Sequence, residues 1–223
     1  MDFQRDYILR MIQMMGDLMR RLAEKLEDRQ RGRMLSDACR EFCGMSLETG
    51  EQLEAASLRE MLAPVPRFML SELLAAKADM VAMPVGDAEE LKLKALRLLS
   101  SLHEEGQLCD LRAERLVTLK VAVFPLLTAA DLMDCARFFF QAEQFDQMED
   151  ALFQAVELSG SDAQESNRLE AIDLLRKASR APENTLALCG MTSHELRQSA
   201  RDLETENQAS VFDDITHEQE NHE

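Results

Sequence analysis

The sequence predicts an all-α protein, and three observations lead to this fold class. Apolar residues recur at steps of three and four along most of the 223-residue chain, which places them on one face of a helix. No segment alternates apolar and polar residues with the β-branched enrichment of a half-buried strand. The 8 Gly and 5 Pro are too few for the many turns of an all-β fold. With 46% hydrophobic residues and 14 Met, the chain is globular and its core is expected to be aliphatic and adaptable.

Residues 2–30 are predicted to form one long amphipathic helix, which defines a first region at 1–31. The apolar stripe runs from Phe3 to Leu26 at helical spacing, and the charged end of the segment is expected to project into solvent. Two interpretations stay open. The stripe packs on the body of the same chain, or it approximates a heptad and forms the seam of a homo-oligomer. A membrane-surface helix is less favoured, because acidic residues are interleaved with the basic ones.

Three further regions follow from composition and helix breakers. The helices shorten over 33–86, where Pro64 and Pro84 mark ends. Residues 87–206 are predicted to form antiparallel helical hairpins. The last residues, 207–223, are polar and acidic without a helical pattern, so we expect them to be disordered.

The most regular segment is 128–160, which is predicted to be two helices joined by a tight turn. Its apolar residues fall at the spacing of the thirty-four-residue tetratricopeptide pattern, at Leu132, Cys135, Ala136, Phe139, Phe145, Met148, Leu152 and Ala155. Gly160 replaces the Pro that closes the pattern. Ala136 is expected to let the second helix approach closely. Met148 stands where the pattern has Ala and is expected to push the helices apart. The segment resembles a degenerate tetratricopeptide repeat, and the alternative is a generic antiparallel helix pair.

A second resemblance concerns the order of the regions. A long amphipathic helix that contains DYILRMIQMM (Asp6 to Met15) precedes a short-helix region and a tetratricopeptide-like half. This order resembles an uncharacterised family of bacterial proteins known as a domain of unknown function. The resemblance to this family implies a bacterial, intracellular, helical protein. The tetratricopeptide resemblance implies right-handed stacking of helices in the C-terminal half. It implies no activity and therefore transfers no catalytic residue.

The sequence shows no motif typical of catalysis, of cofactor binding or of metal binding. The sequence contains no H-E-x-x-H, no glycine-rich phosphate loop and no G-x-S-x-G. Cys39 and Cys43 lie four residues apart on one predicted helix, but a zinc site needs four ligands, so we expect two buried free thiols. The sequence thus predicts no enzyme, no cofactor and no metal site. An enzyme with dispersed active-site residues is the less favoured alternative.

The net charge and the cysteine content indicate which partners and which cellular compartment to expect. A net charge of −17 argues against nucleic acid, whose affinity comes largely from Lys and Arg on phosphates. Five Cys, an odd number without disulfide-framework spacing, and the lack of a signal-peptide pattern predict reduced thiols in the cytoplasm. No apolar run approaches ~18 residues, so no transmembrane segment is expected.

Protein binding is the class of function that these observations leave most favoured. In tetratricopeptide arrays the inner face of the first helix of each pair holds partners, and the resemblance places that face at Met133, Arg137, Phe140 and Gln141. The run Phe138–Phe140 spans about 200° around a helix, so core packing and a binding face are both open for it. The sequence predicts a non-enzymatic protein–protein interaction module whose protein partner it does not identify. The alternative is a structural homo-oligomer assembled through residues 2–30.

Overall fold

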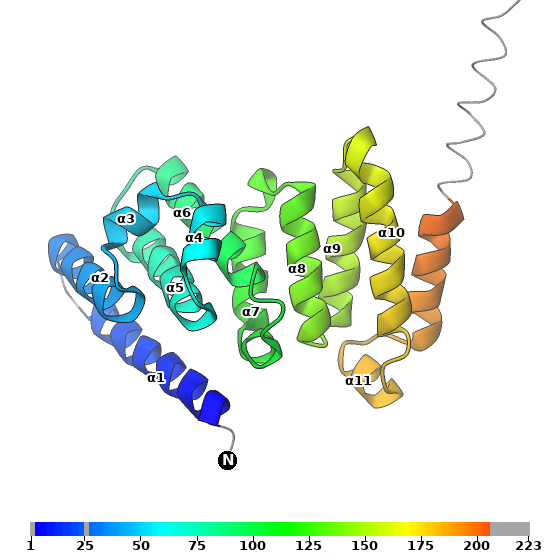
Figure 1. The fold of residues 1–223 in the computed structure, drawn as a ribbon, viewed down its shortest axis with the longest axis horizontal. Coiled ribbons are helices and arrows are strands. Elements are labelled where there is room, and N and C mark those ends of the chain that lie inside the picture. The colour runs from blue at the N-terminus through cyan, green and yellow to red at the C-terminus, as the bar shows by residue number, and fades with distance from the viewer. Residues whose placement is uncertain (1–2, 25–26, 206–223) are drawn as a thin grey trace, which may run out of the picture. The chain divides into compact units, whose positions relative to one another are not determined.

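The computed structural model describes residues 3–24 and 27–205, and these residues form helices and no strand (Figure 1). The prediction of an all-α fold is therefore confirmed. The chain divides into two compact units, with the boundary between Leu127 and Thr128. This boundary falls inside the range 87–206. The acidic segment expected to be disordered, 207–223, lies outside the described residues.

The first unit contains α1 to α7 and a short 3₁₀ helix, and the second contains α8 to α11 and one more helix. The bounds in the first unit are α1 Phe3–Ala23, α2 Asp28–Cys43, α3 Leu47–Gln52, α4 Ala55–Met61, α5 Pro64–Met80, α6 Val85–Ser100, α7 Gly106–Ala122 and η1 Phe124–Leu126. The bounds in the second unit are α8 Ala129–Gln141, α9 Phe145–Glu157, α10 Ser161–Ala178, α11 Glu183–Leu188 and a last helix at 193–205.

The N-terminal helix is shorter than the predicted 2–30. It ends at Ala23, and a new helix begins at Asp28 and runs without a break through the expected boundary near residue 33. The Gln30 side-chain oxygen accepts a hydrogen bond from the Glu27 N–H (3.3 Å), which satisfies a free donor at the start of α2. Arg31 donates to the carbonyl oxygens of Leu22 and Met80, at 3.1 Å each. The charged stretch expected in solvent thus joins the end of α1 to the end of α5.

The stripe of α1 packs partly on its own chain. Ile8, Met15 and Leu22, spaced seven residues apart, are buried, and α1 contacts α5. Tyr7 and Leu9 stay exposed.

Helix α5 is the centre of the first unit. Nine consecutive residues, Phe68 to Ala76, are buried in it, and α1, α2, α3 and α6 all pack against it. A Cβ on Gly50 of α3 would lie 2.9 Å from a methyl carbon of Leu70, so α3 approaches α5 closely at this glycine. Arg67 donates to the carbonyl oxygens of Arg59 (2.7 Å) and Leu62 (3.0 Å), which ties the end of α4 to α5.

A buried carboxylate joins α5 to α7. The Glu72 side chain is only 10% exposed and lies 3.6 Å from Arg112 Nε and 3.3 Å from Arg115 Nε. The Arg112 guanidinium also lies 5.1 Å from the centre of the Phe68 ring, within the range of a cation–π contact. Burial lowers the pKa of Arg112, while Glu72 opposes this effect.

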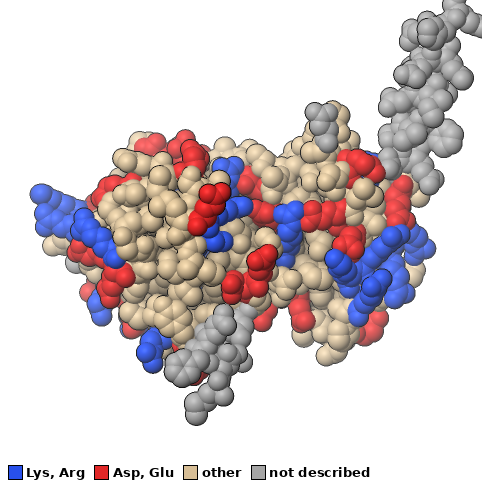
Figure 2. Space-filling view, in the orientation of Figure 1, with Lys and Arg blue, Asp and Glu red and all other residues tan. Residues whose placement is uncertain are grey.

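The second unit is built on the hairpin of α8 and α9. Figure 1 shows α10 beside this hairpin, and α10 packs against both of its helices. The last helix begins with a capping box, since Thr192 and Glu195 exchange side-chain to backbone hydrogen bonds. On the face drawn in Figure 2, basic side chains gather over the C-terminal helices of this unit.

Candidate functional site

The hairpin predicted over 128–160 is present, and local interactions fix both of its ends. The Thr128 hydroxyl accepts from the Asp131 N–H (3.3 Å), and the Asp131 carboxylate accepts from the Thr128 N–H (3.1 Å). At the other end of α8, Glu143 adopts a left-handed conformation with φ of 53°. Gln144 N–H then donates to the Phe139 carbonyl oxygen (3.0 Å), which closes the helix end and lets α9 begin at Phe145.

The three consecutive phenylalanines have different environments. Phe138 and Phe139 are fully buried and lie edge to face, with ring centres 6.4 Å apart. Phe140 is only partly buried and packs edge to face on Phe145, at 6.3 Å. The run therefore supplies two core residues and one residue at the surface.

The residues expected to form the binding face do not share one exposed surface. Met133 is 1% exposed and belongs to the core of the second unit. Arg137 is partly buried and binds both oxygens of Glu170 on α10, at 2.6 and 2.7 Å, and Asp134 at 2.7 Å. The hydrogen bonds with Glu170 raise the pKa of Arg137. Gln141 is exposed.

The accessible part of the expected face is thus an edge of α8. Phe140 and Gln141 present an aromatic ring and an amide there, and the Arg137–Glu170 pair occupies the space between α8 and α10. Sequence reasoning missed Glu170, because its partner is 33 residues away and only α10 packing brings them together.

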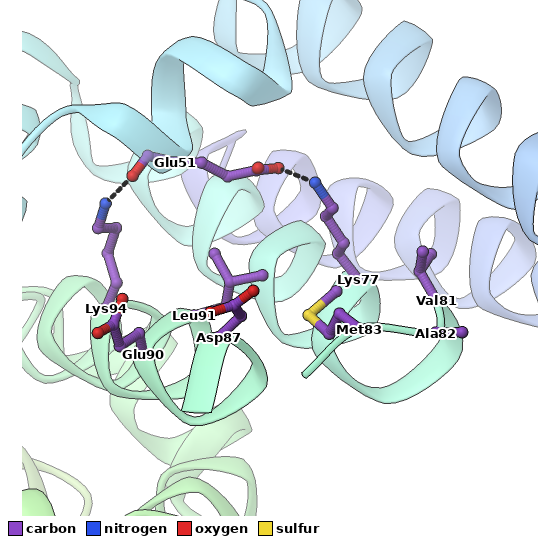
Figure 3. A pocket seen from close by; sticks show the side chains of 9 residues that line it. All are labelled: Glu51, Lys77, Val81, Ala82, Met83, Asp87, Glu90, Leu91 and Lys94. Carbon is purple, nitrogen blue, oxygen red and sulfur yellow. Dashed lines mark hydrogen bonds and ion pairs between the residues drawn. The ribbon is translucent and has the colours of Figure 1, made fainter. Parts of the chain in front are cut away.

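A pocket of about 450 Å³ opens in the first unit where α3, α5 and α6 meet (Figure 3). Two lysines hold Glu51 at its rim. Lys77 lies 2.6 Å from the Glu51 carboxylate, and Lys94 donates to the Glu51 carbonyl oxygen. Burial lowers the pKa of Lys94, and nearby Glu residues oppose this effect.

The contacts in this pocket are of the kind that join helices. Glu51 lies on α3, Lys77 on α5 and Lys94 on α6, so the three side chains hold three elements together. Asp87 and Glu90 add negative charge at the rim, and both residues are exposed. Both lysine amines face an oxygen of Glu51, so neither is presented to the open part of the pocket as a free base (Figure 3).

The cysteine pair of α2 is a packed thiol pair. A hydrogen bond with Cys43 lowers the pKa of Cys39, and the single Cys43 thiol proton has the Pro66 carbonyl oxygen, at 3.4 Å, as an alternative acceptor. Cys39 is buried as expected, whereas Cys43 is only partly buried. Within 3–24 and 27–205, no three His, Cys, Asp or Glu side chains gather in a way that could hold a metal ion.

A second hollow, of about 520 Å³, lies in the second unit between the end of α10 and the helix at 193–205. We name it the arginine cleft, and its lining residues are Arg176, Ser179, Arg180, Arg197, Ala200 and Arg201. Sequence reasoning missed it. The available signal was the four-residue spacing of Arg176/Arg180 and Arg197/Arg201 in an otherwise acidic chain.

Comparison of the chain with protein-family models, with curated proteins and with solved structures gives no match. Among the helices described, none is both long and apolar enough to cross a membrane.

Proposed function

We propose that this chain is a non-enzymatic protein-binding module whose second unit acts as a tetratricopeptide-like surface. The observation that carries the proposal is the packing of α10 against both helices of the α8–α9 hairpin. In a helical repeat array each hairpin contacts its neighbours in this way, and the first helices line the partner-binding face. The resemblance to a bacterial family of unknown function and the odd number of scattered cysteines favour a bacterial, cytoplasmic setting.

The proposed contact surface is the outer edge of α8. Phe140 offers a partly exposed aromatic ring, and phenylalanine is enriched at protein interfaces relative to the rest of the surface. Gln141 offers a donor and an acceptor beside it. Arg137 is held by Glu170 and Asp134, so we assign it the role of fixing the distance between α8 and α10.

Affinity capture with paired surface variants tests this proposal. Gln141→Arg adds one positive charge and bulk at the proposed surface, and Asp150→Arg makes a larger change, of two charge units, at an exposed position on α9. We expect a protein retained by the unsubstituted chain and by Asp150→Arg to be lost with Gln141→Arg, at unchanged circular dichroism. Retention of the same proteins by all three chains would contradict the proposed surface.

A homo-oligomer through α1 is the second candidate, and the exposed Tyr7 and Leu9 favour it. Deleting α1 would uncover the core that Ile8, Met15 and Leu22 fill, so outward substitutions are the sharper test. We expect Leu9→Glu to lower the mass measured by light scattering. A monomer mass for the unsubstituted chain would refute this candidate.

A further inference from the structure

The arginine cleft concentrates positive charge in a strongly acidic protein. The chain has 42 Asp and Glu against 25 Lys and Arg, yet four of the six residues that line this cleft are arginines and none is acidic. Figure 2 shows the basic patch in this part of the second unit.

The charge of the cleft is only partly compensated. Arg176 pairs with Glu204 of the last helix. Arg180, Arg197 and Arg201 form no side-chain ion pair with any residue of 3–24 or 27–205. Like charges four residues apart on a helix repel, as Arg197 and Arg201 do, so a bound anion would stabilise this arrangement.

Guanidinium groups also specify the kind of anion. Their planar fork matches two oxygens of a carboxylate or phosphate, and several arginines around one hollow favour a ligand with several such groups. A ligand that carries carboxylates along a flexible chain would meet the two helices of the cleft at several points.

The chain itself supplies such a ligand. Residues 206–223 contain six Asp or Glu and no Lys or Arg. They follow Thr205 directly, and Arg197 lies eight residues before Thr205 on the same helix, about 12 Å along its axis. An extended stretch from Thr205 to Asp213 spans roughly 27 Å, so its carboxylates reach the cleft easily.

We propose that the arginine cleft binds the acidic C-terminal segment 206–223 of the same chain. Covalent attachment gives the segment a high effective concentration at the cleft, which compensates for the modest strength of exposed charge pairs. The aspartates at 213 and 214, with Phe212 and Ile215 beside them, are the centre of this ligand.

Cleavage by chymotrypsin after Phe212 tests the proposal in the 223-residue chain. Phe212 is the one aromatic residue in 206–223, and mass spectrometry detects release of residues 213–223. We expect Arg197→Gln with Arg201→Gln to accelerate this cleavage about tenfold at low salt. Salt at 0.5 M should accelerate cleavage of the unsubstituted chain in the same way, because it screens exposed charges.

Two controls identify the cause of any protection. Lys92→Gln with Lys177→Gln removes two charges outside the cleft, from lysines paired with Asp79 and Asp173, and should leave the rate unchanged. Asp213→Asn with Asp214→Asn should be cleaved rapidly although all four arginines are present, after correction by the rate of the matching free peptide.

Equal cleavage rates in the unsubstituted chain, the arginine variant and the high-salt sample would overturn the proposal. Protection that survives the arginine substitutions would also overturn it, since the segment would then dock elsewhere. If inorganic phosphate at 10 mM, at matched ionic strength, releases the segment in the unsubstituted chain alone, the cleft binds anions and the segment is its intramolecular ligand.

Discussion

Replacing Glu72 with leucine is expected to destabilise the first unit by about 2–3 kcal/mol. At an effective dielectric constant of 20, the contacts of Glu72 with Arg112 (3.6 Å) and Arg115 (3.3 Å) have gross attractions of about 4–5 kcal/mol each. Desolvation of the carboxylate offsets much of this attraction. Removing one partner of a buried pair costs about 3–5 kcal/mol. The expected loss is smaller here, because the two arginine side chains are 21% and 25% exposed and water reaches them.

The measurement must separate the two units. Pulsed hydrogen exchange across a urea series, read on peptides from α5 and α7, reports the first unit, and peptides from α9 serve as an internal reference. With a slope of about 2 kcal/mol per molar urea, the midpoint of α5 and α7 should fall by about 1–1.5 M. The midpoint of α9 should not move.

Two further variants decide whether the effect is electrostatic. Glu114→Leu removes the same charge from an exposed position of α7 and should shift the midpoint little. Glu72→Leu combined with Arg112→Met and Arg115→Met leaves no unpaired charge and should recover most of the loss. If Glu72→Leu leaves the midpoint unchanged, or if the triple variant is less stable than the single one, the reasoning is refuted.

Three other outcomes follow from local contacts. Burial raises the pKa of the Cys109 thiol from 9.0 to about 12, so only the unfolded chain ionises it between these values. Between pH 9 and 12 the free energy of unfolding of the unsubstituted chain should therefore fall more steeply than that of Cys109→Ala, by up to about 1.4 kcal/mol per pH unit. If urea titrations give the same pH dependence for both chains, this prediction is wrong. Arg67→Lys should destabilise the first unit by about 1–3 kcal/mol, because Arg67 Nη2 donates to the Arg59 and Leu62 carbonyl oxygens while Nη1 donates to Ser101, and a single ammonium nitrogen cannot occupy both positions. An unchanged urea midpoint would count against this role. Glu143→Gly should raise the melting temperature of the second unit, since φ of 53° costs a non-glycine residue about 1 kcal/mol, whereas Glu143→Val should lower it.

The hairpin of α8 and α9 was predictable because its determinants are local. Thr128 and Asp131 lie three residues apart, and the apolar spacing from Leu132 to Ala155 is visible without tertiary information. The break between α1 and α2 was not predictable in this way. The apolar stripe continues past Ala23, and the contacts that hold the break join Arg31 to Leu22 and Met80, the latter 49 residues away.

The environment of the expected binding face also depends on long-range contacts that local sequence does not predict. Periodicity places Met133 and Arg137 on one side of α8, but it gives no information about what covers that side. Packing of α10 brings Glu170 to Arg137, and the core encloses Met133. The arginine cleft likewise depends on two helices meeting, although each of its arginine pairs was visible in the sequence.

The central place of α5 has a consequence for synthesis on the ribosome. Helices α1, α2 and α3 precede α5 in the chain and all pack against it, so the parts of their apolar faces that α5 covers stay exposed until Met80 has emerged. At ordinary elongation rates of about 5–20 residues per second, this leaves the nascent N-terminal segment uncovered for several seconds. The first unit is therefore expected to need chaperone protection early in translation, and its folding should begin as a single late step once α5 is complete.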